Sequence, residues 1–325
     1  MSGRHEQEQK LEQRIESRLY GMPNILSEYY YFLTGSGKTH TTTYRYLNYL
    51  LSFLEFTFQN EDYDEDFYKK IKPIHINKYI TSLRTKEKDG KTTRASDSFR
   101  SVQWSALNLF FQFLVPDYLD SNPVEKTKRP KNKDNPKVTY LTSEEISNFL
   151  DNVEKIAAEK TKNRDLCLFK LGFSTGLRVS AIIQIDIDDI DFKKNQIRVT
   201  EKGDYDDYVM FGDNLKNQLL LWLKDREKYF GHIKSNALFV SRQSARITDA
   251  TVARLIELYA KDVTDKKVTP HVMRHSCATN LYEKTGDIYL CAKQLKHKNV
   301  TTTQRYAEIS NAKQKEAANI LDNLI

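Results

Sequence analysis

A basic segment interrupted by prolines, residues 121–137, divides this chain of 325 residues into two halves of different character. Proline fixes φ and lacks an amide hydrogen, so Pro123, Pro130 and Pro136 prevent regular structure there. The segment's cations outnumber its two acidic residues; they are Lys126, Lys128, Arg129, Lys131, Lys133 and Lys137. We interpret the segment as an interdomain linker, which is either a solvated tether or a tether that follows a phosphate backbone.

The first half is expected to be all-helical, because its apolar residues recur at helical spacing and no strand alternation is found. The clearest pattern covers residues 43–58, and the threonines at 41–43 offer an N-cap. Further helix-like segments cover residues 6–20, 25–33, 74–83 and 96–114.

The second half is expected to be mixed but mainly helical. It opens with a capping box, Thr142 with Glu145, followed by a buried-looking helix over residues 164–174. Three short β-rich runs follow and predict a small antiparallel sheet, before helices resume near Asn214. The runs cover residues 187–192, 196–200 and 208–211.

Composition excludes several classes of protein. Hydrophobic residues make up 39% and charged residues 29%, as in soluble globular proteins, and the apolar runs are too short to span a bilayer. Residues 1–10 carry no signal-peptide pattern. Cys167, Cys277 and Cys291 lack metal-ligand spacing, so we expect free thiols in a reducing cytoplasm. The net charge of +7 and the pI near 9.0 are compatible with a polyanionic partner.

Two motifs suggest chemistry that the rest of their patterns does not support. Residues 35–39 resemble the end of a phosphate-binding loop, but Phe32 stands where that loop needs a glycine, so we expect a turn. His271 and His275 have the four-residue spacing of zinc ligands. Val272 replaces the glutamate of such motifs and no third ligand lies nearby in sequence, so we expect no metal and no cofactor.

Six side chains in the second half form a chemically useful set: Arg178, Lys202, His271, Arg274, His297 and Tyr306. Guanidinium groups bind non-bridging phosphate oxygens and neutralise charge that grows in the transition state. An imidazole exchanges a proton near neutral pH, and an activated hydroxyl can be a covalent nucleophile. The set is the equipment for transferring a phosphodiester without metal, although spacing alone does not show that these residues converge.

The order and local sequence of this set resemble the tyrosine recombinases of the phage-integrase type. The resemblance rests on TGLR at 175–178, HVMRH at 271–275 and LKH at 295–297, with a tyrosine nine residues after the last histidine. It covers residues 140–325, and the helical first half is similar to the family's core-binding domain.

The resemblance implies a role for each residue. Tyr306 would attack the scissile phosphate and form a 3′-phosphotyrosine, while Arg178 and Arg274 clamp the non-bridging oxygens. His271 would help to remove the tyrosine proton, Lys202 would protonate the leaving 5′ oxygen, and His297 would hydrogen-bond the phosphate. The family acts as a tetramer on two double-stranded DNA sites through a Holliday junction, without ATP or metal, and some members need accessory DNA-bending or directionality factors.

The chain departs from the family pattern at four places. Ala181 replaces a usual acidic residue, and Glu201 and Lys296 each replace a common glycine. The turn after Lys202 is acidic, with Asp204, Asp206 and Asp207, where relatives are often basic. These departures remove no catalytic group. They leave open how Lys202 is positioned, and they suggest that activity depends on assembly.

The predicted organisation has five parts. They are an N-terminal helical extension (1–20), a core-binding DNA-binding domain (21–120), a basic linker (121–138), a catalytic domain (139–310) and a C-terminal tail helix (311–325), which packs either on its own domain or on a neighbouring protomer. Candidate DNA contacts are Thr43, Lys126, Lys128, Arg129 and Lys131.

We predict site-specific recombination that integrates and excises a mobile element, in the cytoplasm at the nucleoid. A resolvase of chromosome or plasmid dimers is the alternative within the family. A type IB topoisomerase shares the chemistry but relaxes DNA as a monomer, and a non-catalytic DNA-binding regulator would not need Tyr306. The sequence does not reveal the DNA target.

Overall fold

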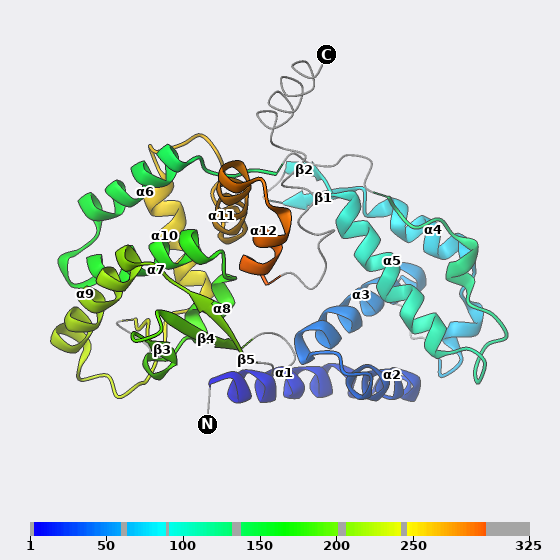
Figure 1. Cartoon of the computed structure of the whole chain (residues 1–325). Helices are drawn as coiled ribbons and strands as arrows, with labels where there is room; N and C mark the ends of the chain where they lie inside the picture. Colours follow the sequence, from blue (N-terminus) through cyan, green and yellow to red (C-terminus); the bar gives the residue numbers. More distant parts are fainter. Residues whose placement is uncertain are drawn as a thin grey trace, which may run out of the picture. The chain divides into compact units, whose positions relative to one another are not determined.

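The computed structural model describes residues 3–59, 64–88, 91–131, 138–200, 206–241 and 246–296. The chain divides into two compact units, Met1–Asn135 and Pro136–Ile325, each with its own hydrophobic core (Figure 1). Helices make up most of both units, so the mainly helical fold class predicted from the sequence is confirmed.

In the first unit, helices pack around a central helix, α3, which contacts α1, α2, α4 and α5. Aromatic side chains fill its core, with Tyr29, Phe53, Phe67 and Phe110 fully buried. The elements in chain order are α1 (Gly3–Leu19), α2 (Asn24–Gly35), α3 (His40–Phe58), η1 (Phe67–Lys70), α4 (Pro73–Ser82), β1 (Thr85–Lys88), β2 (Lys91–Arg94), α5 (Asp97–Phe113) and η2 (Pro123–Lys126).

The start of α3 corrects two predictions. Its N-cap is Thr39, whose hydroxyl accepts a hydrogen bond from the amide of Thr42, and not a residue of 41–43. Thr43 lies inside the helix with a fully buried side chain, so it cannot reach a phosphate and is wrong as a DNA contact. The helical period turns Thr43 toward the core together with Leu47 and Leu50. The predicted turn is confirmed, because Gly37 has a left-handed φ of 74° between α2 and α3.

The first unit also contains a pair of strands that was not predicted. Residues 85–94 form an antiparallel hairpin, with Thr85 opposite Arg94, in a half that the sequence pattern predicted to be all-helical. Each strand is only four residues long, so the alternation of apolar and polar residues along it was too short to detect.

The first part of the predicted linker is folded onto the first unit. Val124 is fully buried in the core of that unit, and the indole of Trp104 on α5 donates to the Thr127 hydroxyl at 2.8 Å. Arg129 donates from Nε to the Ser101 hydroxyl at 2.8 Å, and its guanidinium lies 5.9 Å from the Trp104 ring centroid. Up to Arg129, therefore, the segment is packed against the first unit and is not a solvated tether.

In the second unit, α7 is the central helix and packs against α6, α9 and α11 (Figure 1). The capping box that opens this unit is confirmed, since Thr142 and Glu145 exchange hydrogen bonds at the start of α6. The elements are α6 (Ser143–Ile156), α7 (Glu159–Thr175), α8 (Val179–Gln184), η3 (Ile187–Asp189), β3 (Ile190–Asp191), β4 (Gln196–Thr200), β5 (Asp206–Met210), α9 (Asp213–Phe230), α10 (Asp249–Ala260), α11 (Pro270–Thr285) and α12 (Ile288–Gln294).

The small antiparallel sheet of the second unit has the strand order β3-β4-β5. Ile197 pairs with Val209 across β4 and β5, and both side chains are buried in the core. Arg198 and Tyr208, which form the neighbouring pair of the ladder, are exposed, as the two-residue period of a half-buried strand requires. The sheet therefore packs one face on the core and holds the β4–β5 hairpin at the edge of the unit.

Within the described ranges, no helix is long and apolar enough to cross a bilayer. Cys167, Cys277 and Cys291 are free and buried, as predicted. Burial raises the pKa of the Cys277 thiol to about 12 and that of Cys291 to about 11, which keeps both thiols protonated and unreactive.

Candidate active site

The TGLR motif forms the turn that ends α7. Gly176 adopts a left-handed conformation with φ of 66° and terminates the helix, and Arg178 follows as the exposed N-cap residue of α8. A Cβ atom on Gly176 would lie 2.5 Å from Cδ2 of the buried Leu295, so a larger residue would require Leu295 to move as well as straining the left-handed backbone. The turn thus lies against Leu295, which follows α12, and Arg178 comes two residues after Gly176 in the chain.

The HVMRH motif forms the first turns of α11, as predicted. Thr269 caps this helix by accepting from the amide of Val272, and Pro270 occupies its first position. His271 is exposed, whereas Arg274 is only 6% exposed.

Arg274 joins three segments of the chain. Its Nη1 donates to the carbonyl of Gly176 at 2.7 Å, and its Nη2 donates to the carbonyl of Leu295 at 2.6 Å. A charged donor forms stronger hydrogen bonds than a neutral one, and burial excludes competing water. One guanidinium therefore fixes the TGLR turn and the residue before the LKH lysine relative to α11.

Lys296 extends this network to the β4–β5 hairpin. Its Nζ donates to Oδ1 of Asp207 and to the carbonyl of Tyr208, each at 2.8 Å. Partial burial of Asp207 pushes the pKa of its carboxyl up, but the hydrogen bonds from Lys296 and from the amide of Tyr208 together bring the pKa below its usual value. Hydrogen bonds from Arg274 and Lys296 thus link α11, the end of α12 and the β4–β5 hairpin.

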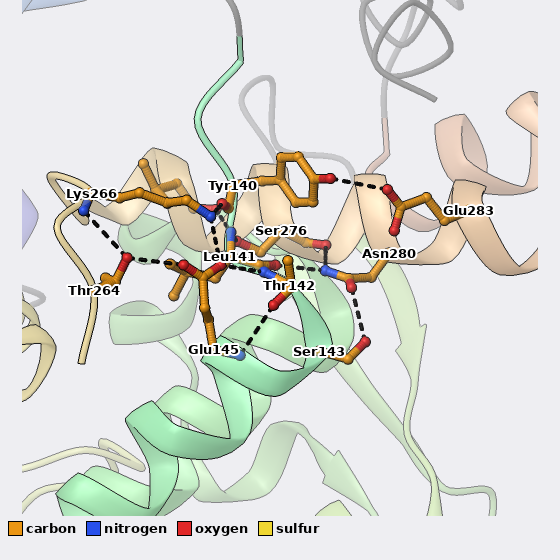
Figure 2. A network of polar contacts seen from close by, with 11 residues as sticks. Tyr140, Leu141, Thr142, Ser143, Glu145, Thr264, Lys266, Ser276, Asn280 and Glu283 are labelled. Atoms are coloured by element: carbon orange, nitrogen blue, oxygen red, sulfur yellow. Dashed lines mark hydrogen bonds and ion pairs between the residues drawn. The ribbon is translucent and has the colours of Figure 1, made fainter. Parts of the chain in front are cut away.

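The chain that enters the second unit is attached to the other end of α11 (Figure 2). The buried Ser276 hydroxyl accepts from the amide of Leu141 at 2.8 Å, and Nδ2 of Asn280 donates to the Leu141 carbonyl at 2.8 Å. The hydroxyl of Tyr140 donates to Glu283 at 3.0 Å. Because these partners share the helix that carries His271 and Arg274, the network fixes the position of that helix against the start of α6.

The structure thus brings together the segments that carry Arg178 and Arg274 and places His271 at the start of the same helix. Lys202, His297 and Tyr306 lie outside the described residues, as does the predicted tail helix, and their roles stay predictions. Lys126, Lys128, Arg129 and Lys131 are exposed on the first unit, as contacts to DNA would require.

The two histidines of HVMRH lie one helical turn apart, with ring centroids separated by 6.4 Å and planes inclined by 29°. In the part of the chain that the structure describes, no group of three His, Cys, Asp or Glu side chains could hold a metal ion.

Sequence reasoning missed the contacts of three residues at this site, Gly176, Asp207 and Lys296. Gly176 was noted only as a turn glycine, and its contact with Leu295 depends on a segment more than a hundred residues away. Asp207 and Lys296 were noted only as departures from the family pattern, yet they are bonded to each other. An acidic and a basic residue that both depart from the family pattern are a signal in the sequence that could have suggested this contact.

Comparison with known proteins agrees with these motifs. The sequence model of the phage integrase family matches residues 139–313. The tyrosine recombinase XerS of Streptococcus thermophilus is 29% identical over 96% of this chain and 98% of its own length. The tyrosine recombinase XerC of Psychromonas ingrahamii is 32% identical over 70% of this chain and 74% of its own length.

Solved structures share the fold. The XerH recombinase bound to a palindromic difH substrate has a TM-score of 0.71 at 23% identity, covering 88% of this chain and 81% of XerH. A dimer of a lambda integrase fragment bound to a COC′ core site has a TM-score of 0.66 at 18% identity, covering 89% of this chain and 95% of that solved chain. Together with the arginine-centred site, the family match establishes that this chain belongs to the phage integrase family of tyrosine recombinases.

Proposed function

We propose that this protein recombines double-stranded DNA at specific sites, by cleaving and rejoining strands through a covalent bond to Tyr306. The observation that supports this best is the buried Arg274, which holds the turn before Arg178 and the segment before His297. A guanidinium carries its five N–H groups in a fixed planar fork, a geometry that matches the oxygens of a phosphate. Fixing the arginine in advance suits stabilisation of a transition state, since little reorganisation is needed at the moment of reaction.

The proposed reaction has two balanced steps. The Tyr306 oxygen attacks phosphorus, the bond from phosphorus to the 5′ oxygen breaks, and a 3′-phosphotyrosine forms. His271 helps to take the phenolic proton, and Lys202 gives a proton to the leaving 5′ oxygen. Arg178, Arg274 and His297 hold the phosphate oxygens. In the second step a 5′-hydroxyl of the partner DNA attacks phosphorus and gives its proton to Lys202, while the bond from phosphorus to the Tyr306 oxygen breaks and the phenolate regains its proton from His271. One phosphodiester bond is exchanged for another in each step, so ATP is not needed.

Assembly is proposed by analogy with the solved relatives. One structure of lambda integrase is a tetramer bound to a Holliday junction. We propose that this chain likewise acts as a tetramer on two DNA sites, at the nucleoid.

Two biological roles use this chemistry. Integration and excision of a mobile element is the role predicted from the sequence. Resolution of chromosome or plasmid dimers is the second candidate, and the match to XerS over nearly the whole of both chains favours it.

The test is recovery of covalent protein–DNA adducts from cells that hold the native genome. Wild-type protein is expected to give adducts, and Tyr306→Phe none, because phenylalanine lacks the attacking oxygen. Tyr289→Phe is a matched control, since Tyr289 is 73% exposed on α12 and has no proposed role. Adducts from Tyr306→Phe at the wild-type level would refute the proposal. Sequencing the attached DNA separates the two roles: ends of a mobile element indicate integration, and a single chromosomal or plasmid site indicates resolution.

A further inference from the structure

Lys296 stands at a position that a lysine occupies only against conformational preference. Its backbone is left-handed, with φ of 54°, a region in which a side chain is strained and glycine is not. Its ammonium is nevertheless well placed, since the side chain is only 17% exposed and donates to both Asp207 and Tyr208. The chain therefore keeps a charged side chain at a point where glycine would relieve the backbone.

Both ends of this contact are anchored. On one side, Leu295 is buried and its carbonyl accepts from Arg274, so the residue before Lys296 is fixed to α11. On the other side, Asp207 pairs with Val199 across the sheet, one pair before the Thr200–Asp206 end of the β4–β5 ladder. The ion pair thus connects a buried arginine to the strand end of the hairpin.

The hairpin carries Lys202. Two peptide units separate Thr200, the last residue of β4, from Lys202, a reach of at most about 7 Å. Lys296 directly precedes His297 in the chain. The contact between Lys296 and Asp207 therefore lies at the strand end from which the chain leads to Lys202, and directly before His297 in sequence.

We propose that Asp207 and Lys296 are positioning residues, whose ion pair holds the hairpin against the end of α12 and so sets Lys202 for protonating the leaving 5′ oxygen. Neither residue reacts; the proton comes from Lys202 as the bond between phosphorus and the 5′ oxygen breaks. The inference rests on the proposed function, in which Lys202 is the general acid.

The test separates leaving-group protonation from every other step. A nicked DNA duplex with the sequence recovered from wild-type adducts is prepared with either oxygen or sulfur at the bridging 5′ position. A thiol has a pKa of about 8.5, far below that of an alcohol, so a thiolate leaves without a proton donor. Cleavage is measured in single turnovers of the full-length protein on both duplexes.

Lys296→Gly and Asp207→Asn are the informative variants, and Lys296→Gly removes the ammonium without straining the left-handed backbone. Each is expected to slow cleavage of the oxygen duplex about tenfold, a part of the 10²–10⁴ that proton transfer contributes, and to cleave the sulfur duplex within about twofold of wild type. The exchanged pair, Lys296→Asp with Asp207→Lys, is expected to recover part of the rate on oxygen. Lys293→Ala, one turn earlier on α12, is the control for loss of a nearby charge.

Equal slowing of Lys296→Gly on both duplexes would overturn the proposal, because it would indicate a general structural role, and so would an unchanged rate on oxygen. Lys202→Ala is measured in parallel. If sulfur does not rescue Lys202→Ala while wild type still forms adducts, the role of Lys202 fails and this inference fails with it. Absence of adducts from wild type would instead be a failure of the proposed function.

Discussion

At the scale of single residues, Gly176 meets three structural requirements of the TGLR turn at once. It ends α7 with a positive φ, its carbonyl accepts from Arg274, and the space that a Cβ would need is occupied by Leu295 and by Sγ of Cys277 at 3.1 Å. Conformation, hydrogen bonding and packing thus each require glycine at the same residue. A side chain there would separate the very segments that the arginine joins.

Gly176→Ala is therefore expected to destabilise the second unit by about 1–3 kcal/mol, the range for a non-glycine residue forced into a strained backbone conformation. Urea unfolding measures this loss, and covalent adduct formation is expected to fall as well, because a strained turn displaces the carbonyl of residue 176 that accepts from Arg274. Gly212→Ala is the matched control, since nothing lies within 4 Å of a Cβ at that N-cap position and its φ of −88° suits alanine. Equal stability of the two variants would contradict this account of the turn.

At the scale of elements, the position of α11 depends on the start of the second unit. Glu145, in the first turn of α6, accepts from Lys266 at 2.6 Å and from Thr264 at 2.9 Å, just ahead of α11 (Figure 2). Burial alone would raise the pKa of this carboxyl. Its hydrogen bonds from Lys266, the Thr142 amide and Thr264 outweigh burial and lower the pKa below 4.5.

The sign of the resulting pH dependence follows from linkage. A carboxyl whose pKa is lower in the folded state contributes stability above its unfolded value of about 4.5 and loses that contribution as pH falls through the folded value. The urea midpoint of wild type is therefore expected to fall between pH 5 and more acidic conditions more steeply than that of Glu145→Gln. Glu144→Gln, at the exposed neighbouring position, serves as the control. Parallel curves for wild type and Glu145→Gln would contradict the contribution assigned to this carboxyl.

At the scale of the whole molecule, a net charge of +7 over two units suits a protein that binds a polyanion through extended surfaces. The exposed cations of residues 126–131 lie on a segment that hydrogen bonds to Trp104 and Ser101 hold against α5. Ordering the backbone before binding reduces the entropy that ordering would otherwise cost on the DNA. A docked basic segment is thus a better binding surface than a free tether with the same charges.

Lys128→Ala with Lys131→Ala is expected to weaken binding to duplex DNA about equally for all sequences. The slope of log affinity against log salt should become shallower by about 2, since each phosphate contact contributes about 0.9. Fluorescence anisotropy over a salt series measures the slope. Lys69→Ala with Lys70→Ala is the charge-matched control in the same unit, because Asp66 and Asp64 already neutralise those lysines. An unchanged slope for the first pair would exclude these lysines as phosphate contacts.

The sequence by itself determined the features that depend on residues close together in the chain. Capping at Thr142, the start of α11 at Pro270 and the turn at Gly176 were all predictable, because caps, prolines and glycines act within a few residues. The family, too, was readable, since its motifs are short and keep their order. The two-stranded hairpin at 85–94 was missed because four-residue strands carry too little alternation.

Only the tertiary structure decided which side chains meet. The threonines at 41–43 look alike in sequence, but the direction in which α3 packs buries Thr43 and leaves Thr39 to cap the helix. The basic segment is interrupted by prolines, yet Val124 finds a place in the core and docks it. Asp207 and Lys296 are 89 residues apart, so no local rule pairs them. Local preference fixes the elements, whereas contacts between distant residues depend on how the packed elements exclude water and satisfy buried polar groups.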